Sequence, residues 1–288
     1  MGVKRLLKLP PVSVIGANIT GTIDIPVGPR YHAIWLSGTN KAATTLAGGT
    51  AIGDIRLKVN GKVQRVHSAI ELNALNTFEG QLSIYGMTDT SGGQFNLPIF
   101  FAEPWRKSYA ATDSMAWGTG DISSFQLEID FLANNPTAIY AVAEVDNSIV
   151  TVNGKTAQAP LGLISKVYRN ILPYTGSSAL YTNFPKRDFY QSISFFDSTI
   201  TKVTVTVDSY RIRELLKVDN DPILTSRGMV PVSTRFDVVF DYDDVPTSAL
   251  PMVNANGDRV QDFQIQIDSS SGTTRNINAL YTLFGPAD

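Results

Sequence analysis

Apolar and polar residues alternate in several short segments, which is the period of a half-buried β-strand. In residues 125–131 (FQLEIDF), large apolar side chains occupy every second position, and Gln, Glu and Asp lie between them. Similar alternation, rich in β-branched and aromatic residues, occurs in residues 138–145, 202–207 and 235–242. These segments are typical of an all-β protein.

Turn signals and one predicted helix interrupt this strand alternation. Asn60-Gly61 and Asn153-Gly154 both lie inside the sequence Val-Asn-Gly-Lys, and Asn-Gly is a strong signal for a tight hairpin. Residues 68–76 (SAIELNALN) have an apolar side at helical spacing. Ser68 and Glu71 have the spacing of a capping box, so a short helix is predicted to begin there.

An internal repeat organises the strands. Residues 52–59 align without a gap on residues 200–207 at an offset of 148, and the same offset pairs Arg65 with Arg213 and Gly80 with Gly228. Blocks that recur in the same order in both halves of a chain indicate tandem copies of one fold.

A second block repeats further along the chain. Residues 125–130 (FQLEID) align on residues 263–268 (FQIQID) at an offset of 138, so the second copy has a shorter connection. The predicted fold is all-β, with two tandem eight-stranded jelly rolls and a short helix in each. The predicted domains are residues 1–150, with a basic amino-terminal arm, and residues 151–288.

The composition excludes several kinds of catalytic and metal-binding site. The 288 residues include no cysteine and two histidines, 17% are charged, and the formal net charge is −2. A disulfide framework, a thiolate metal cluster and a cysteine nucleophile are therefore excluded. His32 alternates with apolar neighbours and is expected to be a hydrogen-bonded strand residue. The small negative charge argues against non-specific contact with nucleic acid.

Catalytic motifs are also missing. The sequence has no Gly-x-Ser-x-Gly elbow, and its Gly-Lys-Thr at residues 154–156 lacks the first glycine of a phosphate-binding loop. No catalytic residue is assigned. A glycan-cleaving amidase or glycosidase remains an alternative, and it would need two facing carboxylates in a cleft between the two sandwiches. The candidates for such a pair are Asp130, Glu144, Asp241 and Asp243.

Two further observations leave alternatives open. Residues 219–221 (DND) and 241–244 (DYDD) gather oxygen donors of the kind that calcium accepts, but neither has EF-hand spacing, so metal ligands stay unassigned. Residues 103–123 lack strand periodicity and contain Trp105 and Trp117. These side chains could stack on sugars in a carbohydrate-binding protein.

The start of the sequence is basic and leucine-rich. Lys4, Arg5 and Lys8 lie among leucines before Pro10-Pro11, and no uncharged apolar stretch approaches the length of a membrane-spanning helix. Two interpretations apply to this arm: a solvated tail, or a short basic segment that contacts lipid headgroups.

The sequence resembles the major capsid proteins of tailless, membrane-containing icosahedral phages of the corticovirus kind, in the double jelly-roll lineage that includes tectiviruses and adenoviruses. The resemblance lies in the order of two similar β domains and in four segments: residues 4–10 (KRLLKLP), 26–34 (PVGPRYHAI), 55–62 (IRLKVNGK) and 97–106 (LPIFFAEPWR).

This resemblance implies a homotrimer of pseudo-hexagonal outline that tiles an icosahedral virion shell over an internal membrane. Its partners would be neighbouring capsomers, minor capsid and vertex proteins, and the viral membrane. Lys4, Arg5 and Lys8 match the family's membrane-facing arm. The resemblance implies assembly in the cytoplasm of a bacterial host, without direct sequence-specific binding of nucleic acid. It implies no cofactor and leaves a structural calcium ion open.

Overall fold

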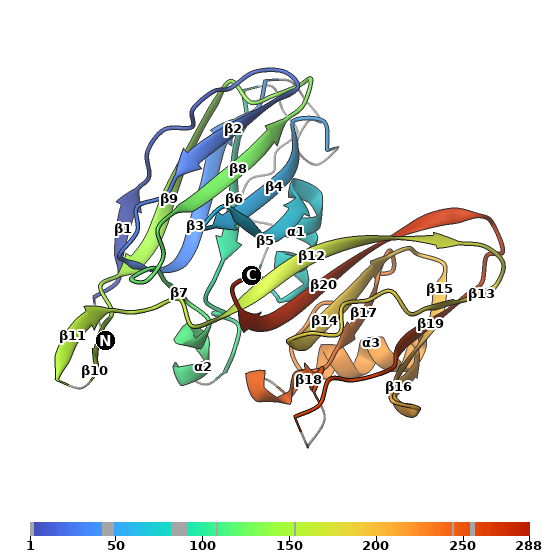
Figure 1. The fold of residues 1–288 in the computed structure, drawn as a ribbon. Coiled ribbons are helices and arrows are strands. Elements are labelled where there is room, and N and C mark those ends of the chain that lie inside the picture. Colours follow the sequence, from blue (N-terminus) through green and yellow to red (C-terminus); the bar gives the residue numbers. More distant parts are fainter. Residues whose placement is uncertain are drawn as a thin grey trace. The chain divides into compact units, whose positions relative to one another are not determined.

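The computed structural model describes residues 3–41, 49–81, 92–107, 109–152, 154–243, 245–253 and 257–288. The chain divides into two compact units (Figure 1). The first consists of Met1–Lys166 and Pro286–Asp288, and the second of Val167–Gly285. The predicted boundary between residues 150 and 151 falls inside strand β10 (Ile149–Val152) of the first unit.

The first unit contains two antiparallel sheets. One has the strand order β1-β9-β3-β6, with the short β7 paired to β3. The other has the order β5-β4-β8-β2, and the first residues of β12 follow at the β5 edge. The bounds in the first sheet are β1 (Arg5–Lys8), β9 (Ala138–Asp146), β3 (Arg30–Thr39), β6 (Gln94–Phe100) and β7 (Trp117–Gly118). Those in the second are β5 (Lys62–Ser68), β4 (Ile52–Val59), β8 (Phe125–Phe131), β2 (Ile19–Asp24) and β12 (Leu163–Tyr174).

Smaller elements complete this unit. Helix α1 (Ala69–Phe78) follows β5, and the short α2 (Tyr109–Ser114) lies in the segment without strand periodicity. Strands β10 and β11 (Lys155–Gln158) form a separate hairpin, in which Val152 pairs with Lys155. Asn153 at its turn lies outside the described residues.

The second unit has the same plan. One sheet has the order β13-β19-β15-β16, and the other has β17-β14-β20-β12, with β18 paired to β14. The bounds are β13 (Ser178–Tyr181), β19 (Phe263–Ser269), β15 (Ile200–Val207), β16 (Tyr210–Leu216), β17 (Phe236–Val239), β14 (Phe189–Phe196), β20 (Arg275–Pro286) and β18 (Leu250–Pro251). Helix α3 (Lys217–Ser226) follows β16, and the 3-10 helix η1 (Pro246–Ser248) precedes β18.

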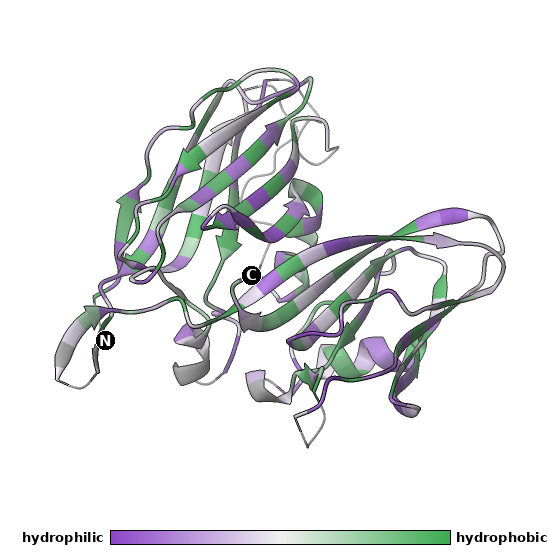
Figure 2. Ribbon diagram, in the orientation of Figure 1, coloured by the Kyte–Doolittle hydropathy of each residue, from purple (hydrophilic) through white to green (hydrophobic). Residues whose placement is uncertain are grey.

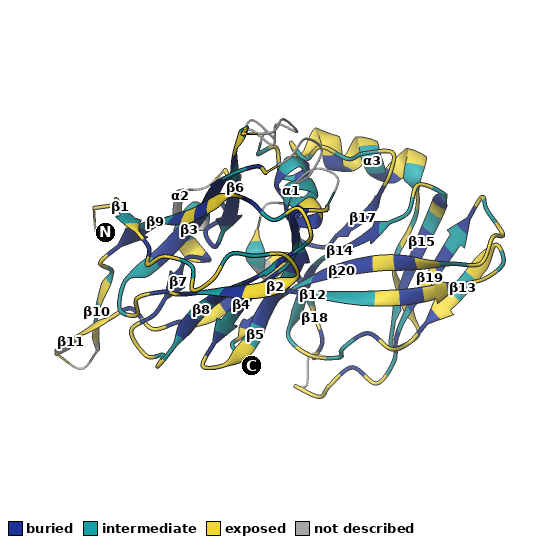
Figure 3. Cartoon of the chain, turned by 90° about the horizontal axis from the view of Figure 1, so that it is seen from above, coloured by how far each residue is buried: buried dark blue, intermediate teal, exposed yellow. Residues whose placement is uncertain are grey.

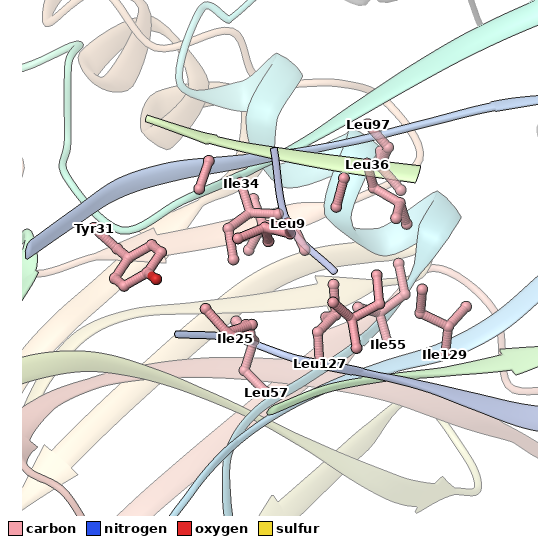
Figure 4. Close-up of a cluster of buried hydrophobic side chains, with 14 of the residues drawn as sticks. Leu9, Ile25, Tyr31, Ile34, Leu36, Ile55, Leu57, Leu97, Leu127 and Ile129 are labelled. Carbon is pink, nitrogen blue, oxygen red and sulfur yellow. The ribbon is translucent and has the colours of Figure 1, made fainter. Parts of the chain in front are cut away.

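Each unit encloses its own apolar core. The alternating hydropathy of the strands is visible along β8 and its neighbours (Figure 2), and the buried positions follow the same period (Figure 3). In the first unit, Ile34 and Leu36 of β3 face Ile55, Leu57 and Leu127 of the opposite sheet (Figure 4). Burial of such side chains is the main source of stability in a sandwich.

The internal repeat is confirmed in detail. β4 and β15, β5 and β16, and α1 and α3 have bounds that differ by 148 at both ends, and those of β8 and β19 differ by 138. The strand register is also repeated, because Leu57 pairs with Leu127 and the equivalent Val205 pairs with Ile265. The two halves are copies of one fold.

The predicted local signals are present. Asn60 and Gly61 have positive φ angles of 50° and 79° at the turn between β4 and β5, as a tight hairpin requires. The side chain of Ser68 accepts from the Glu71 backbone N–H, and the Glu71 carboxylate accepts from the Ser68 N–H. This capping box satisfies two backbone donors where α1 begins.

A repeated tyrosine was not recognised from the sequence. The buried Tyr31 hydroxyl donates to the Pro26 carbonyl at 2.5 Å, and the buried Tyr190 hydroxyl donates to the Pro185 carbonyl at 2.7 Å. The signal is a proline five residues before a tyrosine in each half. Burial raises the pKa of both hydroxyls, so they remain protonated donors.

Candidate functional site

The amino-terminal arm is an edge strand. β1 pairs antiparallel with β9, with Arg5 opposite Val145 and Lys8 opposite Val142. Leu7 packs against the core, whereas Leu6 is 74% exposed and Lys8 is exposed. Arg5–Lys8 therefore form a paired strand, and three of these four residues are exposed to solvent. Among the described residues, no helix is both long and apolar enough to cross a membrane.

The three predicted arm cations have different surroundings. Lys4 Nζ lies 3.1 Å from Asp113 Oδ1 and 3.3 Å from Glu144 Oε1. Burial opposes the charge of Lys4, but its hydrogen bonds to these two carboxylates outweigh that effect and raise its pKa. Arg5 donates to the Asn147 side-chain oxygen at 3.1 Å. The charge of Lys4 is thus balanced by acids of its own chain.

A row of charges continues from Lys4 into the unit. Asp113 also lies 3.3 Å from His32 Nδ1, and His32 Nε2 lies 3.0 Å from Asp146 Oδ2. Asp146 in turn accepts from Arg30 at 2.6 Å. Burial would raise the pKa of Asp146, but Arg30 and His32 outweigh burial and lower it. The buried His32 is therefore a hydrogen-bonded strand residue, as predicted, and it links β3 to β9 and α2.

The four candidate acids do not form a facing pair within either unit. Asp130 accepts two hydrogen bonds of 2.6 Å from Arg56, which lower its pKa. Glu144 contacts Lys4, and it lies on the outer face of the other sheet of the sandwich. In the second unit, Asp243 accepts from the Ser248 hydroxyl and Asp241 is buried. A glycosidase pair needs two acids that share one cleft.

The two tryptophans do not form a sugar-binding platform. Trp117 is fully buried, with its ring centroid 4.7 Å from that of Phe101. Trp105 is half-buried and meets Phe100 edge-on at 5.8 Å. Trp117 therefore belongs to the core of the first unit.

Arg65 is a structural residue that sequence reasoning missed. Its side chain is buried, donates to the carbonyls of Ser165 (2.7 Å) and Phe100 (2.5 Å), and lies 5.0 Å from the Trp117 ring centroid. Burial lowers its pKa to about 10, with a smaller opposing effect of Glu103, so it stays charged at neutral pH. The sequence marks Arg65 only as the repeat partner of Arg213.

Acidic side chains of both clusters contact other residues of the same chain. Asp221 lies 2.9 Å from Lys217, and Asp243 accepts from Ser248 and from the Val245 backbone. Within the described ranges, no group of three or more His, Cys, Asp or Glu residues could hold a metal ion. Metal ligands stay unassigned.

Comparisons with known proteins show which family models and which solved structures this chain matches. Family models of the viral coat protein P2 N-terminal domain and the viral coat protein P2 C-terminal domain match residues 6–146 and 164–284. The major capsid protein P2 from bacteriophage PM2 is similar in structure, with a TM-score of 0.79, 16% identity, and 99% of this chain and 98% of that chain covered. The major capsid protein of Sulfolobus turreted icosahedral virus has a TM-score of 0.71 and 14% identity, with 99% and 97% covered. No curated protein matches the sequence.

Two tandem sandwiches with one repeated strand order define a double jelly roll, the fold of both of these capsid proteins. The two family models together cover nearly all of the chain, and the chain belongs to the viral coat protein P2 family. It is a major capsid protein, structural rather than enzymatic, and part of the virion shell.

Proposed function

We propose that the chain assembles into homotrimers of pseudo-hexagonal outline, which tile an icosahedral shell over an internal membrane. The observation that carries this proposal is the structural repeat, because two similar units in one chain let a trimer present six similar wedges. Neighbouring capsomers and minor capsid and vertex proteins would complete the shell.

Light scattering after size exclusion tests the trimer. The purified chain should elute as a stable species of about three times its mass of 31.3 kDa. A chain that stays monomeric at every concentration would contradict the proposal.

We further propose that β1 lies on the membrane side of the shell. Its exposed positions combine an apolar residue, Leu6, with a cation, Lys8, and Arg5 adds a second cation whose contact is a neutral amide. Apolar and basic groups together favour the surface of an anionic bilayer.

Vesicle binding tests this role of the arm. The double variant Arg5→Ala/Lys8→Ala should bind anionic vesicles about 30-fold more weakly, since each cation near such a surface contributes about 1 kcal/mol. Lys4 is left out of this variant, because its removal would also leave the carboxylates of Asp113 and Glu144 without their cation.

The matched control removes an exposed lysine and an exposed arginine elsewhere, as Lys62→Ala/Arg227→Ala. This variant has the same net charge as the arm variant and should bind like the unmodified chain. Equal loss in both double variants would show that net charge, rather than the arm, attracts the vesicles.

A further inference from the structure

The two copies of the repeat differ at one strand edge. β16 of the second unit is equivalent to β5 of the first, but it is more exposed along most of its length. Gln64 is fully buried, whereas its equivalent Ile212 is 41% exposed. Ser68 is half-buried, whereas its equivalent Leu216 is 46% exposed.

The first unit covers the outer edge of β5 with its own residues. The beginning of β12 follows β5 in the sheet order, and the Ser165 carbonyl accepts from Arg65 at 2.7 Å. The Asp288 backbone N–H donates to the Gln64 side chain at 3.1 Å. In the described part of the second unit, β16 is the last strand of its sheet. An uncovered edge strand is a template for pairing with another chain.

Two exposed positions of the open edge carry apolar side chains where the covered edge is polar. Gln64 and Ser68 of β5 are equivalent to Ile212 and Leu216 of β16. Other positions change in the opposite sense, since Val63 and Val66 are equivalent to the charged Arg211 and Glu214. Exposure of large apolar side chains to water is unfavourable, so Ile212 and Leu216 are suited to burial against a partner.

Helix α3, which follows β16 along the chain, also carries exposed apolar side chains. Its equivalent α1 buries five residues, whereas α3 buries two, and exposed residues are visible along it in Figure 3. We define the β16–α3 patch by the exposed apolar side chains that the two elements share: Tyr210 (76%), Ile212, Leu216, Val218 (72%) and Ile223 (42%). Beside it lies a pocket of about 100 Å³, lined by Arg213, Leu215, Ile223 and Tyr242 among others.

We propose that the β16–α3 patch is the surface on which a second copy of this chain docks. The inference rests on the proposed self-association and names the surface that carries it. A second copy is the occupant because a segment of this sequence already covers the equivalent edge in the first unit. The exposed apolar side chains of the patch are of the kind that the centre of a subunit interface buries, and the charged residues between them, such as Arg211 and Glu214, already pair with each other.

Thiol labelling tests the patch directly, since the chain contains no cysteine. Ile212→Cys introduces one thiol into the patch. Leu180→Cys introduces a matched thiol into β13, at the far edge of the same sheet, where Leu180 is 56% exposed. In the oligomer, Ile212→Cys should react with a small maleimide at least about tenfold more slowly than Leu180→Cys, and dilution to monomers should remove the difference.

Charge insertion gives a second readout. Ile212→Glu/Leu216→Glu should weaken self-association at least about 100-fold, because unpaired carboxylates would be buried in an apolar contact. Leu180→Glu should assemble as the unmodified chain does. Thermal unfolding of each variant checks that it is folded. If Ile212→Glu/Leu216→Glu does not fold, the cysteine variants still test the patch.

Three outcomes would overturn the inference. Oligomers in which the Ile212→Cys thiol stays reactive would place the contact elsewhere, while leaving the homotrimer itself intact. Protection that persists in diluted monomers would show that the same chain covers the patch. An unmodified chain that never associates would remove both the homotrimer and its proposed surface.

Discussion

Replacing Arg65 by methionine should lower the free energy of unfolding of the first unit by about 3–5 kcal/mol. The change removes the Arg65 donor from the buried Ser165 carbonyl and the partly buried Phe100 carbonyl, and it removes the cation from the Trp117 ring. Each unsatisfied buried polar group costs about 1–3 kcal/mol. All three tryptophans of the chain lie in the first unit, so tryptophan fluorescence in urea reports on this unit alone.

The repeat supplies a matched control for this experiment. Arg213 occupies the position equivalent to Arg65, but it is half-buried and lies over the Tyr242 ring at 4.6 Å. Arg213→Met should cost about 1 kcal/mol or less, the usual contribution of an exposed cation–π contact. If both variants lost the same stability, the role assigned to the Arg65 carbonyl contacts would be incorrect.

Replacing Asp237 by alanine should destabilise the second unit by about 3–5 kcal/mol, because it leaves a buried arginine without its carboxylate. Arg235 Nε lies 2.7 Å from Asp237 Oδ1, and both side chains are 1% exposed. The Ser194 hydroxyl also donates to Asp237 at 2.6 Å. Hydrogen exchange of the β14 and β17 amides, which pair with each other, measures the loss in this unit.

A double variant separates the pair from simple packing. Arg235→Met/Asp237→Leu removes both charges and keeps most of the side-chain volume, so it should recover at least about half of the loss caused by Asp237→Ala. A double variant as unstable as the single one would show that packing or the Ser194 contact, rather than the lost carboxylate beside Arg235, determines the effect.

The fold was predictable where local pattern and repetition coincide. The blocks at residues 52–59 and 200–207 have the bounds of β4 and β15, and the capping box at Ser68 begins α1 as expected. Alternation specifies which residues face a core, and it does so without knowledge of the partner strand. For that reason the repeat remained visible at low sequence similarity.

The surroundings of individual residues were less predictable. Arg65 and Arg213 are equivalent in sequence, yet only Arg65 is buried, because the residues that cover it lie about a hundred positions later in the chain. Trp117 could not be distinguished from an exposed stacking residue, because its ring is covered by Phe101 and Phe125, and the sequence does not show that these residues meet it. The membrane role of Lys4, Arg5 and Lys8 depends on a partner outside the chain and stays a proposal.

The division of the chain has a consequence for how the protein is made. Residues 286–288 belong to the first unit, although the whole second unit lies between them and Lys166. One of them, Asp288, contacts both Lys166 at 2.9 Å and Gln64 at 3.1 Å. During synthesis the first unit therefore lacks these contacts until the second has left the ribosome. The β5 edge, where the two repeats differ, is therefore completed only after the second unit has been synthesised.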